Sequence, residues 1–196
     1  RVTLTLPARM PERAGRDFAE EKAGWLKDAV DKVMEPVQVT LGATVPVEDR
    51  MLPVIAGEGR SARLTPSAIE APPGREGPTI EALLKALARE RLAQSVRQFT
   101  TSLGRSQKRM TLRDTRSRWG SCSSEGNLMF SWRLVMAPEY VLAYVAAHEV
   151  AHLKHMDHSL DFWATVRELY PGEPSARLWL KRNGSALHRY RFRRSD

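Results

Sequence analysis

The sequence predicts an α+β fold, in which a β-rich first part precedes a long helix, a sheet and a helical C-terminal part. Residues 36–71 contain short β-prone pieces such as VQVTLG, and Pro and Gly residues separate them. Apolar residues at helical spacing recur later in the chain. We therefore expect a β-rich N-terminal subdomain over residues 1–78 and a second domain over residues 79–196.

In the first part, the alternating segment RVTLTLP (residues 1–7) predicts a strand. A helix is expected over Glu12–Met34, because its apolar residues are spaced to share one face. The pieces between Pro36 and Ala71 predict a small meandering sheet. The segment APPGREGPT, which ends at Thr79, is then a linker or turn.

The second part begins with a long helix from Thr79, its expected N-cap, to Leu103, before Gly104. The segments QKRMTLRD and GNLMFSWRL predict strands, with RSRWGSC as their connection and SSEGN as a turn. Three helices should follow, and they are expected from Pro138 to about Lys154, from a cap at Ser159 through Glu168, and over Ala176–Asn183.

Composition limits the class of protein. The 31 Lys and Arg residues exceed the 23 Asp and Glu residues and give a net charge of +8, which permits acidic or nucleic-acid partners. The most basic stretch, HRYRFRRSD at the C-terminus, is more typical of a packed or solvated strand than of a nucleic-acid site. The single cysteine excludes an intrachain disulfide and suits a cytoplasmic protein. No run of about 18 apolar residues predicts a membrane span.

The segment around the helix expected from Pro138 carries the most informative residues. Between Val141 and Leu153, the only ionisable side chains besides Tyr144 are His148, Glu149 and His152, listed here in chain order. A helix that is apolar on nearly every side is a buried one. Each buried polar group without a partner would cost roughly 1–3 kcal/mol, so something must satisfy these three, and a metal ion does so.

The spacing matches a metal site. His148 and His152 lie one helical turn apart on one face, so their imidazoles can converge on one ion. Glu149 lies about 100° round the helix and can reach a metal-bound water without being a ligand. This is the HExxH pattern of zinc metallopeptidases. A third ligand could be His155 or His158, and we favour His158 because the chain can turn back before it.

Three segments resemble the YgjP-like metallopeptidase family, which is related to the SprT-like and WLM zinc peptidases. They are RWGSCSSEGNLMFSWRL (Arg118–Leu134), YVAAHEVAHL (Tyr144–Leu153) and HSLDFW (His158–Trp163). The resemblance implies a zincin-like metallopeptidase domain with Zn²⁺ as cofactor, and it places the third ligand at His158. It also implies a strand beside the active-site helix. Leu128–Leu134 is the candidate, either as an edge that pairs with substrate or as a plain core strand.

The expected activity is hydrolysis of polypeptide by a zinc-activated water, with Glu149 as general base and no organic cofactor. Tyr144, one turn before His148, is a candidate oxyanion stabiliser, although a hydrogen-bonded core tyrosine is the commoner meaning. One alternative is hydrolysis of a phosphoanhydride, but such sites usually hold magnesium on carboxylates. Another is a nucleic-acid-associated SprT-like protease, although the sequence shows no DNA-reading motif.

Overall fold

The computed structural model describes residues 6–7, 10–23 and 35–193 and shows mixed α and β structure. It divides into two compact units, Arg1–Glu35 and Pro36–Asp196. The first unit contains helix α1 (Glu12–Glu21); the predicted strand at residues 1–5 and the remainder of the predicted helix, at residues 24–34, lie outside the described residues. No helix in the described part of the chain is long and apolar enough to cross a membrane.

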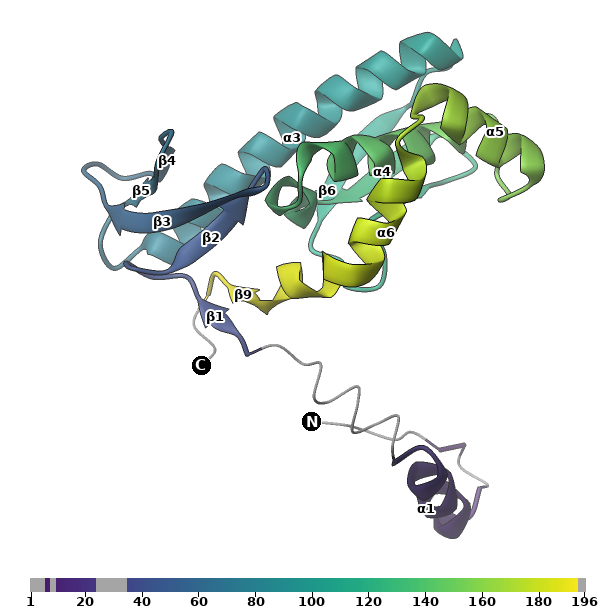
Figure 1. The fold of residues 1–196 in the computed structure, drawn as a ribbon, viewed down its shortest axis with the longest axis horizontal. Helices are drawn as coiled ribbons and strands as arrows, with labels where there is room; N and C mark the ends of the chain where they lie inside the picture. Colours follow the sequence, from purple (N-terminus) through teal and green to yellow (C-terminus); the bar gives the residue numbers. More distant parts are fainter. Residues whose placement is uncertain (1–5, 8–9, 24–34, 194–196) are drawn as a thin grey trace. The chain divides into compact units, whose positions relative to one another are not determined.

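The second unit begins with short strands, as predicted (Figure 1). Their bounds are β1 (Val37–Gln38), β2 (Thr44–Val47), β3 (Arg50–Ala56), β4 (Arg63–Leu64) and β5 (Ile69–Ala71). Four of them form a sheet in the order β2-β3-β5-β4. The expected meander is wrong in one respect: β5 pairs parallel with β3, because β4 takes the edge position and runs antiparallel to β5.

Strand β1 does not join that sheet. It pairs in parallel with β9 (Tyr190–Arg191), near the C-terminus. Tyr190 and Phe192 are buried, so the aromatic residues of the basic tail pack into the fold, as the favoured interpretation of that tail predicted. The predicted boundary between residues 78 and 79 falls inside the second compact unit; a separate N-terminal subdomain stays a prediction.

Helix α3 (Glu76–Leu103) is the longest element, with 28 residues (Figure 1). It begins three residues earlier than predicted, because Pro78 fits the first turn, where backbone N–H groups need no helical acceptor. Thr79 is therefore inside the helix, and its hydroxyl donates to the Arg75 carbonyl at 2.8 Å. The predicted end is confirmed, since Gly104 has a left-handed backbone with φ 64°.

A second sheet has the strand order β6-β8-β7. Its strands are β6 (Arg109–Arg113), β7 (Gly120–Cys122) and β8 (Asn127–Ser131). The expected connection RSRWGSC therefore contains a strand of its own. Because β8 is paired on both sides, the proposed substrate-pairing edge at Leu128–Leu134 is wrong, and the segment is a core strand that continues into the 3-10 helix η1 (Trp132–Met136).

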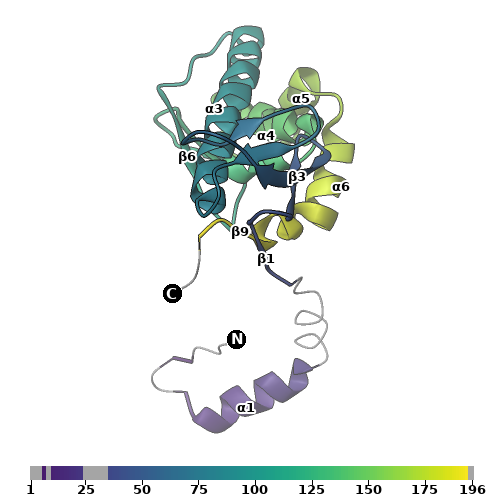
Figure 2. The same cartoon turned by 90° about the vertical axis from the view of Figure 1, so that its left-hand side faces the viewer.

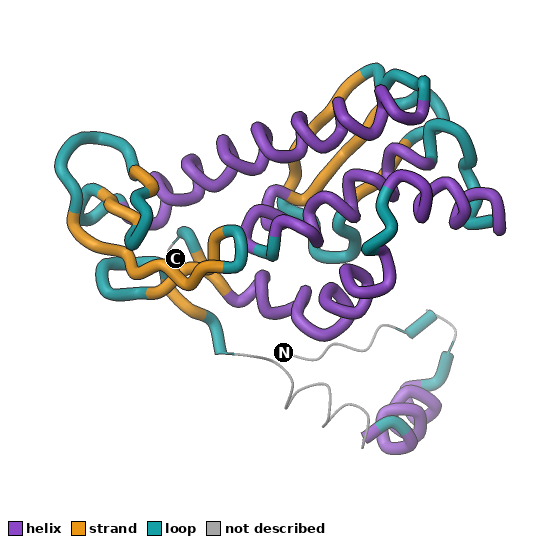
Figure 3. Tube along the Cα trace, turned by 45° about the horizontal axis from the view of Figure 1, so that its top comes forward, coloured by secondary structure: helices purple, strands orange, loops and turns teal. Residues whose placement is uncertain are grey.

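The remaining helices are α4 (Glu139–Ala151), α5 (Leu160–Leu169) and α6 (Glu173–Asn183), and the 3-10 helix η2 (Gly184–Arg189) precedes β9. The predicted cap of α5 is confirmed, because the Ser159 hydroxyl accepts the Phe162 N–H at 3.4 Å. Helix α4 contacts α3, α5, α6 and β7, which explains why it is apolar on nearly every side (Figures 1 and 2). The two larger sheets lie towards opposite ends of α3 (Figure 3).

Candidate metal centre

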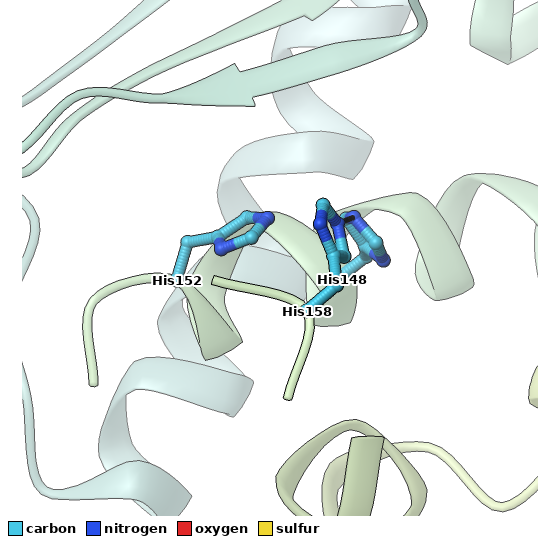
Figure 4. A group of neighbouring side chains, drawn as sticks. All are labelled: His148, His152 and His158. Atoms are coloured by element: carbon cyan, nitrogen blue, oxygen red, sulfur yellow. Dashed lines mark hydrogen bonds between the residues drawn. The ribbon is translucent and has the colours of Figure 1, made fainter. Parts of the chain in front are cut away.

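Three of the histidines singled out from the sequence come together in the structure (Figure 4). His148 lies on α4, His152 is its C-cap residue, and His158 comes from the loop before α5. One ring nitrogen from each lies within 4.8 Å of the others. His155 is not in this group; its backbone carbonyl instead accepts a hydrogen bond from His152 Nδ1 at 2.9 Å. The structure therefore groups His158, rather than His155, with His148 and His152.

The ring nitrogens lie close enough together that the group could hold a metal ion. Nε2 of His158 lies 3.2 Å from Nε2 of His148, close to the roughly 3.3 Å that separates two donors of a tetrahedral zinc site. A carbonyl oxygen can only accept a hydrogen bond, so Nδ1 of His152 carries the proton of that ring. Its Nε2 then has a lone pair that can bind an ion. Nδ1 of His148 is buried and has no hydrogen-bond partner among the described residues.

Burial favours the neutral form of His148 and His152, the form in which an imidazole binds a metal. Burial and the neighbouring His152 and His158 lower the pKa of His148 to about 3. Burial also lowers the pKa of His152, although its bond to the His155 carbonyl opposes that shift. Neutral imidazoles offer lone pairs to a cation rather than a positive charge. The three residues therefore fit a divalent metal.

Two aromatic residues from the first turn of α5 hold the histidine rings in place. Phe162 is fully buried and stacks on His152, with ring centroids 4.4 Å apart. Trp163 lies 5.7 Å from His148 and 5.8 Å from His158, measured between ring centroids. Both belong to the segment HSLDFW, which the sequence analysis singled out. Their support for the histidines was not predicted, although their position one turn after His158 is a signal that could have indicated it.

Glu149 is buried beside the histidines, with only 5% of its surface exposed. Burial raises its pKa to about 8, and the charge of Arg118 acts in the opposite direction. A Cβ atom added to Gly120 would lie 2.5 Å from Glu149 Oε1 and 2.6 Å from its Cγ. The backbone of β7 therefore lies directly against this side chain, a contact that the sequence analysis missed.

Tyr144 and Cys122 complete the surroundings. The Tyr144 ring lies 6.0 Å from the His148 ring, and burial raises the pKa of its phenol to about 12. Tyr144 is itself buried, with 5% of its surface exposed. Burial and Glu149 raise the pKa of the Cys122 thiol to about 11, and Cys122 is not in the histidine group, so it acts as a packed residue.

Comparison with known proteins identifies the family. The crystal structure of the metallopeptidase zymogen of Pyrococcus abyssi abylysin is 24% identical, with a TM-score of 0.43, over 50% of this chain and 97% of that one. The corresponding zymogen of Methanocaldococcus jannaschii jannalysin is 19% identical, with a TM-score of 0.41, over 47% and 95%. No curated protein matches. The model of the YgjP-like metallopeptidase domain matches residues 1–183, and the chain therefore belongs to the YgjP-like metallopeptidase family.

Proposed function

We propose that this metallopeptidase uses Zn²⁺ held by His148, His152 and His158, and that Pro36–Asp196 contains a zincin-like domain. The observation that carries the proposal is the meeting of three imidazoles within 4.8 Å beside a buried glutamate. A set of three imidazole nitrogen donors suits zinc, whereas magnesium and calcium prefer oxygen ligands. Three protein ligands also leave a fourth position for water, as catalytic zinc sites require.

The metal ion and the side chains around it would have different roles in the reaction. Bound Zn²⁺ would supply a Lewis acid and lower the pKa of a coordinated water to about 7. Glu149 would take the proton of the attacking water and return it to the leaving amine. Its burial against Gly120 restricts where the carboxylate can lie, so the proton acceptor is held at a fixed position.

Tyr144 is suited to stabilise the oxyanion that forms on the attacked carbonyl. Its ring packs edge-on against the His148 ring, with centroids 6.0 Å apart. Burial keeps the phenol protonated at neutral pH, because its pKa is raised to about 12. A neutral hydroxyl group near the reacting carbonyl can donate a hydrogen bond to the developing charge.

An extended polypeptide would bind along β7. This strand pairs with β8 on one side only, and no other described strand pairs with it. Gly120 at its start touches Glu149, so a peptide added to this edge would pass close to the proton acceptor. Strand β7 thus takes the role for which the sequence had suggested Leu128–Leu134.

The test compares wild type with Glu149→Gln and with Glu139→Gln, a control on the exposed first turn of the same helix. All three proteins should hold the same amount of zinc, because neither glutamate is a ligand. Cleavage of an unfolded polypeptide should fall by about 10²–10⁴-fold in Glu149→Gln only, the range for loss of a general base. Equal cleavage by Glu149→Gln would contradict the proposed role. Hydrolysis of nucleoside triphosphates instead of polypeptide would move the reaction to phosphoanhydrides.

A further inference from the structure

We propose that Arg177 binds a carboxylate group of the substrate beside the metal centre, so that the enzyme prefers peptides with a negative charge near the bond that it cleaves. This inference rests on the proposed peptidase function and extends it to the class of substrate. Arg177 lies on α6 and belongs to none of the motifs that the sequence analysis singled out. The position of Arg177, its fixed orientation and its unpaired N–H donors suit it to this role.

The guanidinium group of Arg177 lies one aromatic ring away from the histidines. Its Cζ atom is 4.6 Å from the centroid of the Trp163 ring, in a cation–π contact. The same ring lies 5.7 Å from His148 and 5.8 Å from His158. A substrate bound at the metal centre would therefore pass within reach of a positive charge that Trp163 holds in place.

A buried carboxylate fixes the arginine from the other side. Nη1 of Arg177 donates to Oε1 of Glu173 at 2.8 Å, and the Glu173 side chain is only 6% exposed. The hydrogen bond with Glu173 raises the pKa of Arg177 above its ordinary value, so the group stays charged. Stacking and ion pairing together hold a long side chain in one orientation before a ligand arrives, which lowers the entropy cost of binding.

Most donors of Arg177 remain available. The bond to Glu173 is the one hydrogen bond that the group makes to residues the structure describes, and its side chain is 55% exposed. A guanidinium group has five N–H donors in a planar fork, and a carboxylate accepts two of them side by side. Glu173 occupies one nitrogen, so the fork can still take a second carboxylate.

Arg177 also joins two helices, because it forms an ion pair with Glu173 on α6 and lies over the ring of Trp163 on α5. A residue that only joined α6 to α5 would have no reason to influence substrate choice, and this difference makes the proposal testable.

The carboxylate could come from an Asp or Glu side chain or from the free C-terminus of a peptide. The experiment uses zinc-loaded full-length protein and peptides that carry Glu or Gln at successive positions around one cleaved bond. A second pair has a free or an amidated C-terminus. Wild type should favour the charged member of one pair at least about tenfold in kcat/KM, the effect of one charged hydrogen-bonded pair, mostly through KM.

Arg177→Gln should abolish this preference and still cleave the neutral peptide with its zinc bound. Arg182→Gln, an exposed arginine later on α6, is the matched control and should keep the preference. If Arg177→Gln does not fold, Arg177→Lys keeps the charge without the fork and should show a reduced preference. The role of Arg177 is overturned if wild type and the Arg177 variants show the same preference, or if wild type shows none. Either result leaves the proposed peptidase function intact. Failure of zinc-loaded wild type to cut any peptide overturns the proposed function as well.

Discussion

The backbone of Gly120 lies so close to the side chain of Glu149 that position 120 has no room for a Cβ atom. The Cβ atom of an alanine at position 120 would come within 2.8 Å of three Glu149 side-chain atoms, Oε1, Cγ and Cδ. Glu149 is buried at 5% exposure, so its carboxylate could move only by displacing neighbours. Glycine at this position is therefore required by the side chain of Glu149 rather than by a special backbone angle.

Gly120→Ala should lower kcat/KM for polypeptide by about 10²-fold, since a displacement of about 1 Å at a reacting group has costs of this size. Zinc content should stay unchanged, because Gly120 does not contact the histidine nitrogens. Ser121→Ala is the control, since the next residue of a strand faces the opposite side. Steady-state kinetics with metal analysis checks this, and wild-type activity in Gly120→Ala would show that Glu149 needs no fixed position.

His188 links stability to pH. Its ring stacks on Trp119 at 5.2 Å between centroids, and its Nε2 is buried without a partner among the described residues. Burial and the charge of Arg133 lower its pKa, and Asp114 acts against them. Because the folded pKa lies below the unfolded value of about 6.5, the unfolded chain binds more protons between the two values. The stability contributed by neutral His188 is thus present above pH 6.5 and lost as pH falls below it.

The free energy of unfolding should therefore fall less between pH 7 and pH 5 in His188→Phe than in wild type. Phenylalanine keeps a ring against Trp119 but cannot be protonated. Urea denaturation at both pH values measures the two differences. An equal fall in both proteins would mean that His188 titrates alike in the folded and unfolded chains.

At the scale of elements, helix α3 supports the helix that carries the HExxH residues. Its buried side chains recur at every fourth residue, at Ile80, Leu84, Ala88, Leu92 and Val96. Side chains at this spacing form one row along the helix. Helix α4 packs on α3, so this row fixes the position of His148 and Glu149 from behind.

Leu92→Ala should lower the free energy of unfolding by about 2–5 kcal/mol, the usual cost of removing a fully buried leucine side chain. Leu178→Ala is the control on α6, where the leucine is 45% exposed, and it should change stability by no more than about 0.5 kcal/mol. Denaturant titration checks both. A similar loss of unfolding free energy in the two variants would mean that the buried row of α3 is not a main part of the core.

Elements with a clear signal in a short stretch of sequence were predicted, and those without one were missed. Helix α4 and the cap at Ser159 were predicted because a proline at a first helical turn, an apolar run and an N-cap residue are visible over a few positions. Strand β7 was missed because three half-buried residues carry no alternating pattern. The error moved the expected substrate-pairing edge to β8, which is the longer and more apolar strand but has partners on both sides.

At the scale of the whole second unit, the contacts that complete the fold join distant residues. Strand β1 at Val37 pairs with β9 at Tyr190, and Arg133 of η1 donates to the Leu187 and Tyr190 carbonyls. No periodicity in the sequence indicates which distant segments will pair, so neither contact was predicted. The histidine group was indicated by the sequence because His148 and His152 lie one turn apart, on α4 and at its C-cap, whereas Gly120 and Arg177 come from other elements.

The most direct test of the account is the zinc content of wild type, His158→Ala and His155→Ala, measured by elemental analysis after dialysis against the same buffer. We expect one zinc in wild type and in His155→Ala, whose backbone carbonyl can still orient His152. His158→Ala should lose the metal, because only two of the three converging nitrogens remain. Zinc retained by His158→Ala but lost from His155→Ala, or absent from wild type after zinc loading, would contradict the three-histidine centre.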